Sequence, residues 1–277
     1  MTRNDKIKIA VLLSLWALLF LPIYPEMVRD WLGHSDNSHG FLVPVMAGYF
    51  VWQRKEQLQS ANLGSSLWGG VLLFLALVLY LLSYAGGQAF PCRCALVLSL
   101  FGLLWCSLGR GITKILAFPV LFLLFMIPVP YSLMGSVSLP LQLIATRLSA
   151  NLIEACSIPV YREGNMLYFM NTQLEVAEAC SGIRSILSLT MLAVIFASMV
   201  RDGWKKRAIL VASAIPIAML ANIMRISMTG IMAHFFGAKV ARGFLHEFSG
   251  IAIFAFGFVV LLGIFKIINR GKFEDVK

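Results

Sequence analysis

Residues 178–200 read EACSGIRSILSLTMLAVIFASMV. This stretch places one thiol, Cys180, among polar and charged residues at the start of an uncharged apolar run over 185–200. Two further polar clusters lie at similar boundaries: ANIMRI at 221–226 closes an apolar run, and HEFSG at 246–250 opens another. Charged groups are costly near the hydrocarbon core of a bilayer, so their presence at these three edges indicates function.

The composition is that of an integral membrane protein. Of the 277 residues, 59% are hydrophobic and 13% are charged, whereas a soluble domain carries about 25% charged residues. The mean hydropathy is +0.83. No large soluble domain fits between the apolar runs, which predicts a single membrane-embedded domain over 1–277. The net charge of +10 does not indicate nucleic-acid binding, because the basic residues lie in short loops between apolar runs.

The apolar runs predict an all-α, polytopic helical bundle of about eight transmembrane helices, each needing about 20 apolar residues. The candidate spans are 9–25, 40–53, 67–85, 94–109, 115–134, 185–200, 208–224 and 248–265. The run at 40–53 is short, so whether it crosses the membrane stays open. We expect the first span to be retained, because LPIYP follows it instead of a small-residue cleavage site.

The segment 135–158 determines on which side the downstream clusters lie. It carries Arg147 and Glu154, and its leucines can share one stripe of a helix. If it crossed the membrane, the basic loop at 204–207 would lie outside, against the positive-inside rule. We therefore predict an amphipathic interfacial helix here, followed by a short extended or hairpin segment over 164–176. Both termini are then cytoplasmic, and the three polar clusters share the outer face.

Cys180, His246 and Arg225 together make up the set that thiol-based acyl transfer needs. A helix N-terminus and Arg184, one turn further along, both favour the thiolate. His246 can take the thiol proton and later protonate the leaving amine. Arg225 can stabilise the oxyanion of a tetrahedral intermediate as a permanent cation.

Each of the three residues also has a structural interpretation. Cys180 can be a small buried filler, Arg225 can extend to the lipid headgroups, and His246 can be an interfacial polar residue. Six other polar residues are supporting or substrate-binding candidates: Glu178, Ser181, Arg184, Asn222, Glu247 and His39. No metal or organic cofactor is indicated, because the five cysteines are not spaced like a zinc site or a disulfide framework.

At these residues the chain resembles the exosortase/archaeosortase family of membrane cysteine transpeptidases, in its bacterial exosortase branch. The resemblance rests on EACSGIR at 178–184, ANIMRI at 221–226 and HEFSG at 246–250. The stretch SHGFLVP at 38–44 is also similar to the N-terminal motif of the family. These motifs occur in the family's order and cover most of the chain.

The resemblance implies a nucleophile at Cys180, a general acid/base at His246 and an oxyanion stabiliser at Arg225. It implies that the substrates are exported proteins with a tripartite C-terminal sorting signal of the PEP-CTERM type. Such proteins would be cleaved through a thioester at the periplasmic face of the inner membrane and passed to an acceptor, for example a polysaccharide or a lipid-linked group. No nucleic acid is implied.

Two other classes of function stay open from the residues alone. In a transporter or channel, Arg184, Arg225 and the glutamates would line a polar path. In a non-catalytic subunit of a polysaccharide export system, the same residues would serve assembly.

Overall fold

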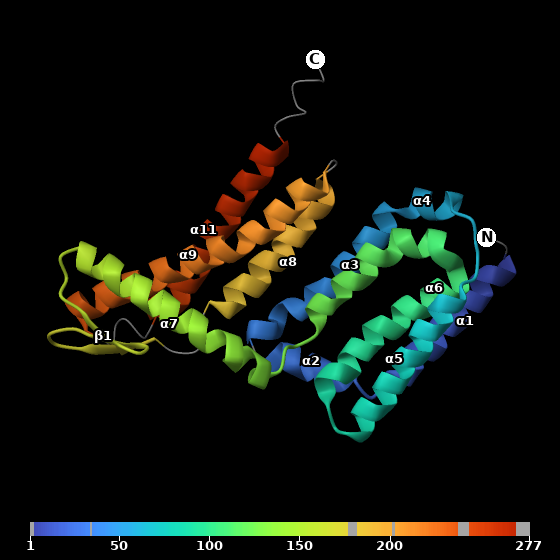
Figure 1. Cartoon of the computed structure of the whole chain (residues 1–277), viewed down its shortest axis with the longest axis horizontal. Helices are drawn as coiled ribbons and strands as arrows, with labels where there is room; N and C mark the ends of the chain where they lie inside the picture. Colours follow the sequence, from blue (N-terminus) through green and yellow to red (C-terminus); the bar gives the residue numbers. More distant parts are fainter. Residues whose placement is uncertain (1–2, 34, 177–181, 201–202, 238–243, 270–277) are drawn as a thin grey trace, which may run out of the picture. The chain divides into compact units, whose positions relative to one another are not determined.

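The computed structural model describes residues 3–33, 35–176, 182–200, 203–237 and 244–269. Its elements are helices and one small three-stranded antiparallel sheet. The chain divides into two compact units, Met1–Pro130 and Tyr131–Lys277, and each is described by itself (Figure 1).

The N-terminal unit is helical wherever the structure describes a regular element. These elements are α1 (Arg3–Leu19), α2 (Tyr24–Gly33), the 3₁₀ helix η1 (Ser35–Phe41), α3 (Leu42–Gln53), α4 (Lys55–Ser60), α5 (Leu67–Ala85), α6 (Ala89–Phe122) and the 3₁₀ helix η2 (Leu123–Met126). The predicted first span, 9–25, is interrupted: α1 and α2 form a pair bent by 66°. Pro22 and Pro25 explain the interruption, because proline cannot continue a helix but fits its first turn.

The long helix α6 is broken at Gly109. This residue has φ 78° and ψ 175°, values that residues with a Cβ rarely adopt. The segment that precedes α5 packs on the break, where the Gly64 backbone N–H donates to the Leu108 carbonyl at 3.1 Å. The break lies at the end of the predicted span 94–109. Ala89–Met126 nevertheless forms one candidate membrane span, so the end of a span at this position stays a prediction.

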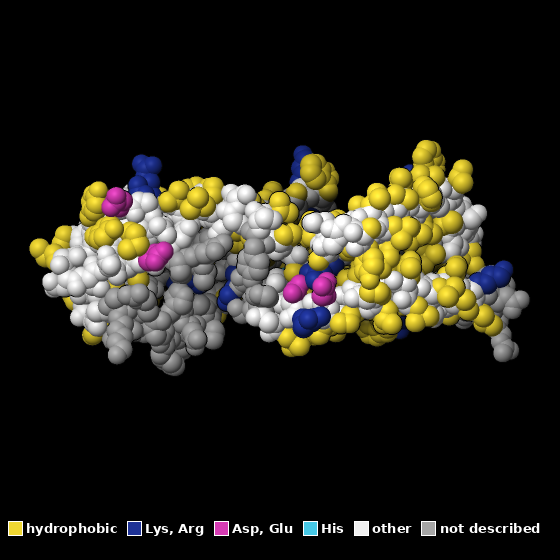
Figure 2. All heavy atoms as spheres, turned by 90° about the horizontal axis from the view of Figure 1, so that it is seen from below, with side chains coloured by type: hydrophobic (Ala, Val, Ile, Leu, Met, Phe, Trp, Pro, Cys, Tyr) yellow, Lys and Arg dark blue, Asp and Glu magenta, His cyan; other side chains and the backbone are white. Residues whose placement is uncertain are grey.

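Hydrophobic side chains cover much of the surface of this unit. Figure 2 shows them over α1 and α5, and the exposed fractions agree: Leu18 is 63% exposed, Phe74 65% and Leu82 69%. A surface of this kind suits contact with lipid and not with water.

Among the described residues, three helices are long and apolar enough to cross a membrane: Leu67–Ala85, Ala89–Met126 and Trp204–Phe236. The bent pair of α1 and α2 adds a fourth if it forms one span. These helices agree with the predicted all-α membrane protein. The predicted number of about eight spans is not confirmed, because several of the apolar helices are short or bent.

The C-terminal unit contains long helices and the sheet. Its described elements are α7 (Tyr131–Ala155), β1 (Tyr161–Glu163), β2 (Met166–Tyr168), β3 (Gln173–Glu175), α8 (Ile183–Met199), α9 (Trp204–Phe236) and α11 (Phe244–Asn269). Each strand pairs antiparallel with the next. The sequence predicted both a helix over 135–158 and an extended hairpin over 164–176, and α7 and strands β2 and β3 confirm them.

Helices α8, α9 and α11 pack side by side (Figure 1). A short connection joins α8 to α9, which run antiparallel. Helix α11 runs parallel to α8, because Gly257 lies against Leu189 and, further along both helices, Phe265 stacks on Phe196 at 5.2 Å. The shared core contains fully buried residues from all three helices: Leu189, Ala193, Leu210, Ala214, Ala218 and Leu261.

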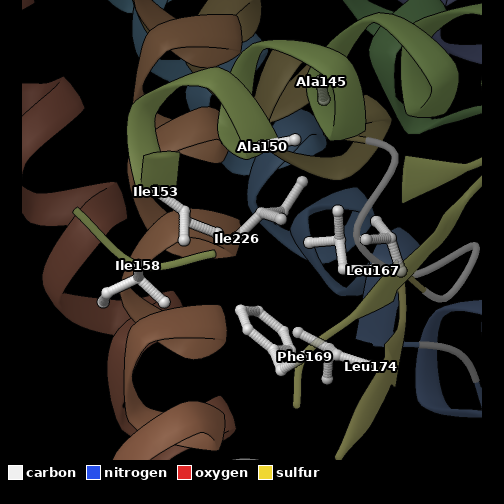
Figure 3. Packing of buried hydrophobic residues seen from close by; sticks show 9 residues of the cluster. Ala145, Ala150, Ile153, Ile158, Leu167, Phe169, Leu174 and Ile226 are labelled. Atoms are coloured by element: carbon white, nitrogen blue, oxygen red, sulfur yellow. The ribbon is translucent and has the colours of Figure 1, made fainter. Parts of the chain in front are cut away.

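Helix α7 and the sheet cover the C-terminal half of α9. Figure 3 shows Ile153 of α7, Ile226 of α9, and Phe169 and Leu174 around one buried cluster. This packing corrects one expectation from the sequence. Arg225 was expected to end a span over 208–224, but α9 continues past it to Phe236, because α7 and the sheet bury the residues that follow.

Helix α7 buries its polar face instead of its leucine face. The leucines that the sequence places on one stripe are exposed: Leu139, Leu143, Leu148 and Leu152. The residues on the opposite face are buried, and most are small or polar: Ser138, Gln142, Ala145, Thr146, Ser149 and Ile153. A helix with an exposed leucine face opposite a buried polar face is suited to meet lipid on its outer side.

Candidate active site

The segment with the expected nucleophile is described at both flanks but not at its centre. Cys180, Glu178 and Ser181 lie outside the described residues. Val176 and Gly182 are the described residues on either side of this segment.

The first flank is held by α7. Gln142 Nε2 donates to the Val176 carbonyl, which also accepts from Asn165 Nδ2 at 3.3 Å. The Val176 N–H in turn donates to the Asn165 carbonyl at 2.9 Å. Val176 is only 2% exposed, so the chain leaves the sheet at a well-defined point.

The second flank lies directly against α9. Gly182 precedes α8 with φ 82°, and a Cβ at this position would lie 3.2 Å from Nδ2 of Asn222. The contact joins two of the sequence motifs, 178–184 and 221–226, which are far apart along the chain. Only glycine satisfies both the positive φ and the close approach.

Asn222 and Arg225 share one face of α9, since they are three residues apart. Asn222 is 2% exposed, and Arg225 is partly buried. Hydroxyl groups bind the helix backbone beside them: Ser149 Oγ of α7 donates to the Ile223 carbonyl at 3.1 Å, and Thr229 Oγ1 donates to the Arg225 carbonyl at 2.8 Å. The guanidinium therefore projects from a helix whose position is fixed by α7.

The third motif begins α11, and its depth follows from helix geometry. Gly257 lies against Leu189 of α8 and Ile217 of α9, which sets these three residues at one level. At 1.5 Å per residue, His246 lies about 16 Å before Gly257, and Arg225 lies about 12 Å beyond Ile217 in the same direction. The backbone of His246 is thus at nearly the depth of Arg225. The side chains of His246 and Glu247 lie outside the described part of the chain.

Two of the supporting candidates have other surroundings. Arg184 is exposed in the first turn of α8. His39 belongs to η1 of the N-terminal unit and is partly buried. The next residue, Gly40, lies against the Trp31 ring, whose Nε1 donates to the Met126 carbonyl at 2.9 Å. This packing gives the Ser-His-Gly motif a structural reason for its glycine.

Sequence reasoning missed the residues that hold the site from α7. Gln142 and Ser149 bind the backbone on either side of the motif segments, at Val176 and Ile223. A signal was present: polar residues recur at helical spacing opposite the leucines of α7, and a polar stripe buried in a helix pair is hydrogen-bonded in most proteins.

The comparison with protein-family models identifies one family. The family model described as transmembrane exosortase (Exosortase_EpsH) matches residues 31–263, which include all four motifs. No curated protein and no solved structure is significantly similar to the chain.

Proposed function

Because the chain belongs to the transmembrane exosortase family, we propose that it is a membrane cysteine transpeptidase or endopeptidase. Its substrates are exported proteins with a C-terminal sorting signal of the PEP-CTERM type. Cys180 is the nucleophile, His246 the general acid and base, and Arg225 the stabiliser of the oxyanion.

One observation carries the proposal: Gly182 of the cysteine motif packs against Asn222 of the arginine motif. Cys180 is two residues from Gly182 along the chain, a reach of at most about 7 Å, which supports a proposed thiol site near Asn222. Arg225 is one turn further along α9. The proposal therefore has the guanidinium act on the carbonyl that the thiol attacks.

The reaction follows from these groups. His246 accepts the thiol proton, the sulfur adds to the scissile carbonyl, and Arg225 binds the resulting oxyanion. When the carbon–nitrogen bond breaks, His246 returns the proton to the leaving amine, and a thioester remains on Cys180. An acceptor nucleophile or water then attacks the thioester, loses its proton to His246 and restores the thiol. A transmembrane tail on the substrate supplies effective concentration for the first step.

The charges of the N-terminal unit support a cytoplasmic N-terminus. The chain between α4 and α5 packs at the Gly109 break, so the basic residues there, including Lys55, Arg110 and Lys114, lie at one end of the unit. Glu26 and Asp30 pair with Arg93 near the start of α6, at the end of this helix that lies away from the Gly109 break. The basic end is cytoplasmic by the positive-inside rule, which supports a cytoplasmic N-terminus.

We expect a membrane-impermeant thiol reagent to modify Cys180 in intact spheroplasts. The test protein keeps Cys180 as its only cysteine. A matched protein carries a single cysteine by Lys55→Cys, at the basic end, and should react only after the membrane is opened. Labelling in the opposite order would refute the proposed sidedness.

We expect Gly182→Ala to lower processing at least tenfold. Alanine at this position must keep a positive φ, which costs about 1–2 kcal/mol. Its Cβ also displaces the Asn222 side chain, so the thiol and the guanidinium lose their relative position. Gly164→Ala is the matched control, since Gly164 has φ 59° but nothing within 4 Å of an added Cβ. The control should lose similar stability in thermal unfolding and keep its activity. Equal loss of activity in both would mean that strain alone is responsible.

A processing assay tests the proposed function. The protein is expressed with a tagged substrate that ends in a PEP-CTERM-type signal, and the mass of the substrate is measured. Loss of the C-terminal tail only when the protein is present supports the proposal. An unchanged substrate mass in the presence of accumulated protein contradicts it.

A further inference from the structure

The buried polar face of α7 binds the backbone beside two of the sequence motifs. Gln142 is 5% exposed, and Ser149 is fully buried. Gln142 Nε2 donates to the Val176 carbonyl, shortly before the cysteine motif at 178–184. Ser149 Oγ donates to the Ile223 carbonyl, inside the arginine motif, at 3.1 Å. One helix therefore holds the chain at both motifs.

The turn of α9 that carries Arg225 is bound on either side of this residue. The Ile223 carbonyl accepts from Ser149, and Ser227 Oγ donates in return to the Ser149 carbonyl at 3.5 Å. Ser227 is only 2% exposed, so both hydrogen bonds lie where water does not compete with them. The turn cannot slide or rotate against α7 without breaking this pair of bonds.

The part of α7 between its two donors is a regular stretch of helix. Gln142 and Ser149 are two turns apart, about 10 Å along the axis, and no glycine or proline lies between them. Thr146 is also fully buried, and its hydroxyl donates to the Gln142 carbonyl of the same helix at 2.7 Å. Ala145 packs into the hydrophobic cluster on this face (Figure 3). The stretch therefore acts as a fixed spacer between the two bound segments.

We propose that Gln142 and Ser149 are positioning residues, through which α7 sets the distance between the nucleophile segment and the turn of Arg225. The inference rests on the proposed function and adds a role for α7 in the rate. Both side chains use their donors on backbone carbonyls of the chain itself, so they act through the two motifs and not on the substrate. A misplacement of about 1 Å between reacting groups can cost about 10²-fold in rate.

Kinetics of Gln142→Met test the role of Gln142, because methionine keeps the length of the side chain and removes the donor. We expect the single-turnover rate of processing to fall about 10²-fold. KM should stay near the wild-type value, because the groups that bind substrate are unchanged. Thr146→Val is the matched control: it removes a buried hydroxyl from the same face of α7, but one that binds only its own helix. It should keep both kinetic constants.

Hydrogen exchange of the peptide 165–176 gives a second measurement, which does not depend on catalysis. We expect faster exchange in Gln142→Met than in the wild type, because the Val176 carbonyl keeps only its bond from Asn165 Nδ2. Thr146→Val should exchange like the wild type. Unchanged exchange in Gln142→Met would overturn the inference that Gln142 holds this segment.

Ser149→Ala tests the other end of the spacer and is also the test if Gln142→Met does not accumulate. It should lower the rate and leave KM unchanged. The double variant should lose little more than the more impaired single variant, because residues that act as a unit have strongly non-additive effects. Losses that multiply would overturn the inference that the two residues set one distance.

Two further kinetic results would contradict the inference. Equal losses in Gln142→Met and Thr146→Val would overturn it in favour of general destabilisation of α7. A raised KM with an unchanged rate would overturn it in favour of a role in substrate binding. Absence of processing by the wild type would refute the proposed function itself, and hydrogen exchange would still decide whether Gln142 holds the segment.

Discussion

We expect Cys180→Ala to abolish removal of the sorting signal, while the protein accumulates in the membrane at the level of the wild type. Loss of the nucleophile from a catalytic set of this kind costs on the order of 10⁶-fold in rate. Processing therefore falls below detection. The change removes one sulfur atom and leaves both flanks of the segment as they are, so the fold is expected to persist. The measurement is the mass of a tagged substrate after expression with each variant.

Cys156→Ala is the control for this experiment, because Cys156 is an exposed cysteine at the end of α7. It should process substrate like the wild type. Full processing by Cys180→Ala would exclude the thiol as nucleophile. A transporter or an assembly subunit would also keep its function in that variant, so the experiment separates the proposed enzyme from both of the other classes.

We expect Arg225→Lys to lower the rate of processing about 10²- to 10³-fold, the effect of losing one oxyanion donor. Lysine keeps the charge, but its ammonium cannot reproduce the fixed planar donors of the guanidinium. Substrate binding should remain, because the proposed interaction forms mainly in the transition state. The measurements are single-turnover rate and substrate retention in detergent.

Arg147→Lys is the control, since Arg147 is an exposed arginine on α7 of the same unit. It should change neither quantity. If Arg225→Lys loses substrate binding and keeps the rate for the substrate that remains bound, Arg225 serves recognition instead of catalysis.

The helices and the meeting of the first two motifs were predictable from the sequence for different reasons. Apolar runs locate helices because the bilayer leaves few other solutions for the backbone, and α5 at 67–85 agrees with this. The contact of Gly182 with Asn222 brings two of the predicted motifs together, and the expectation that all three share the outer face stays a prediction. The roles of Cys180, His246 and Arg225 stay predictions.

The helix ends were not predictable in the same way. Arg225 looked like the end of a span because it is charged, but a helix does not stop at a charge when other elements bury the residues beyond it. Here Ile226 packs into the cluster beneath α7 and the sheet. The supporting role of Gln142 was hidden for a similar reason: its acceptor at Val176 becomes adjacent only when the sheet folds against α7. Both cases depend on contacts between distant segments, which local patterns do not encode.

The most direct test of the central claim is to isolate the acyl-enzyme. The wild-type protein is mixed with substrate and quenched in acid, and the peptide that contains Cys180 is analysed by mass spectrometry. The account predicts an added mass equal to the substrate without its tail, attached to Cys180 and released by hydroxylamine, as expected for a thioester. Continued processing with no such adduct, or with the adduct on another cysteine, would contradict it.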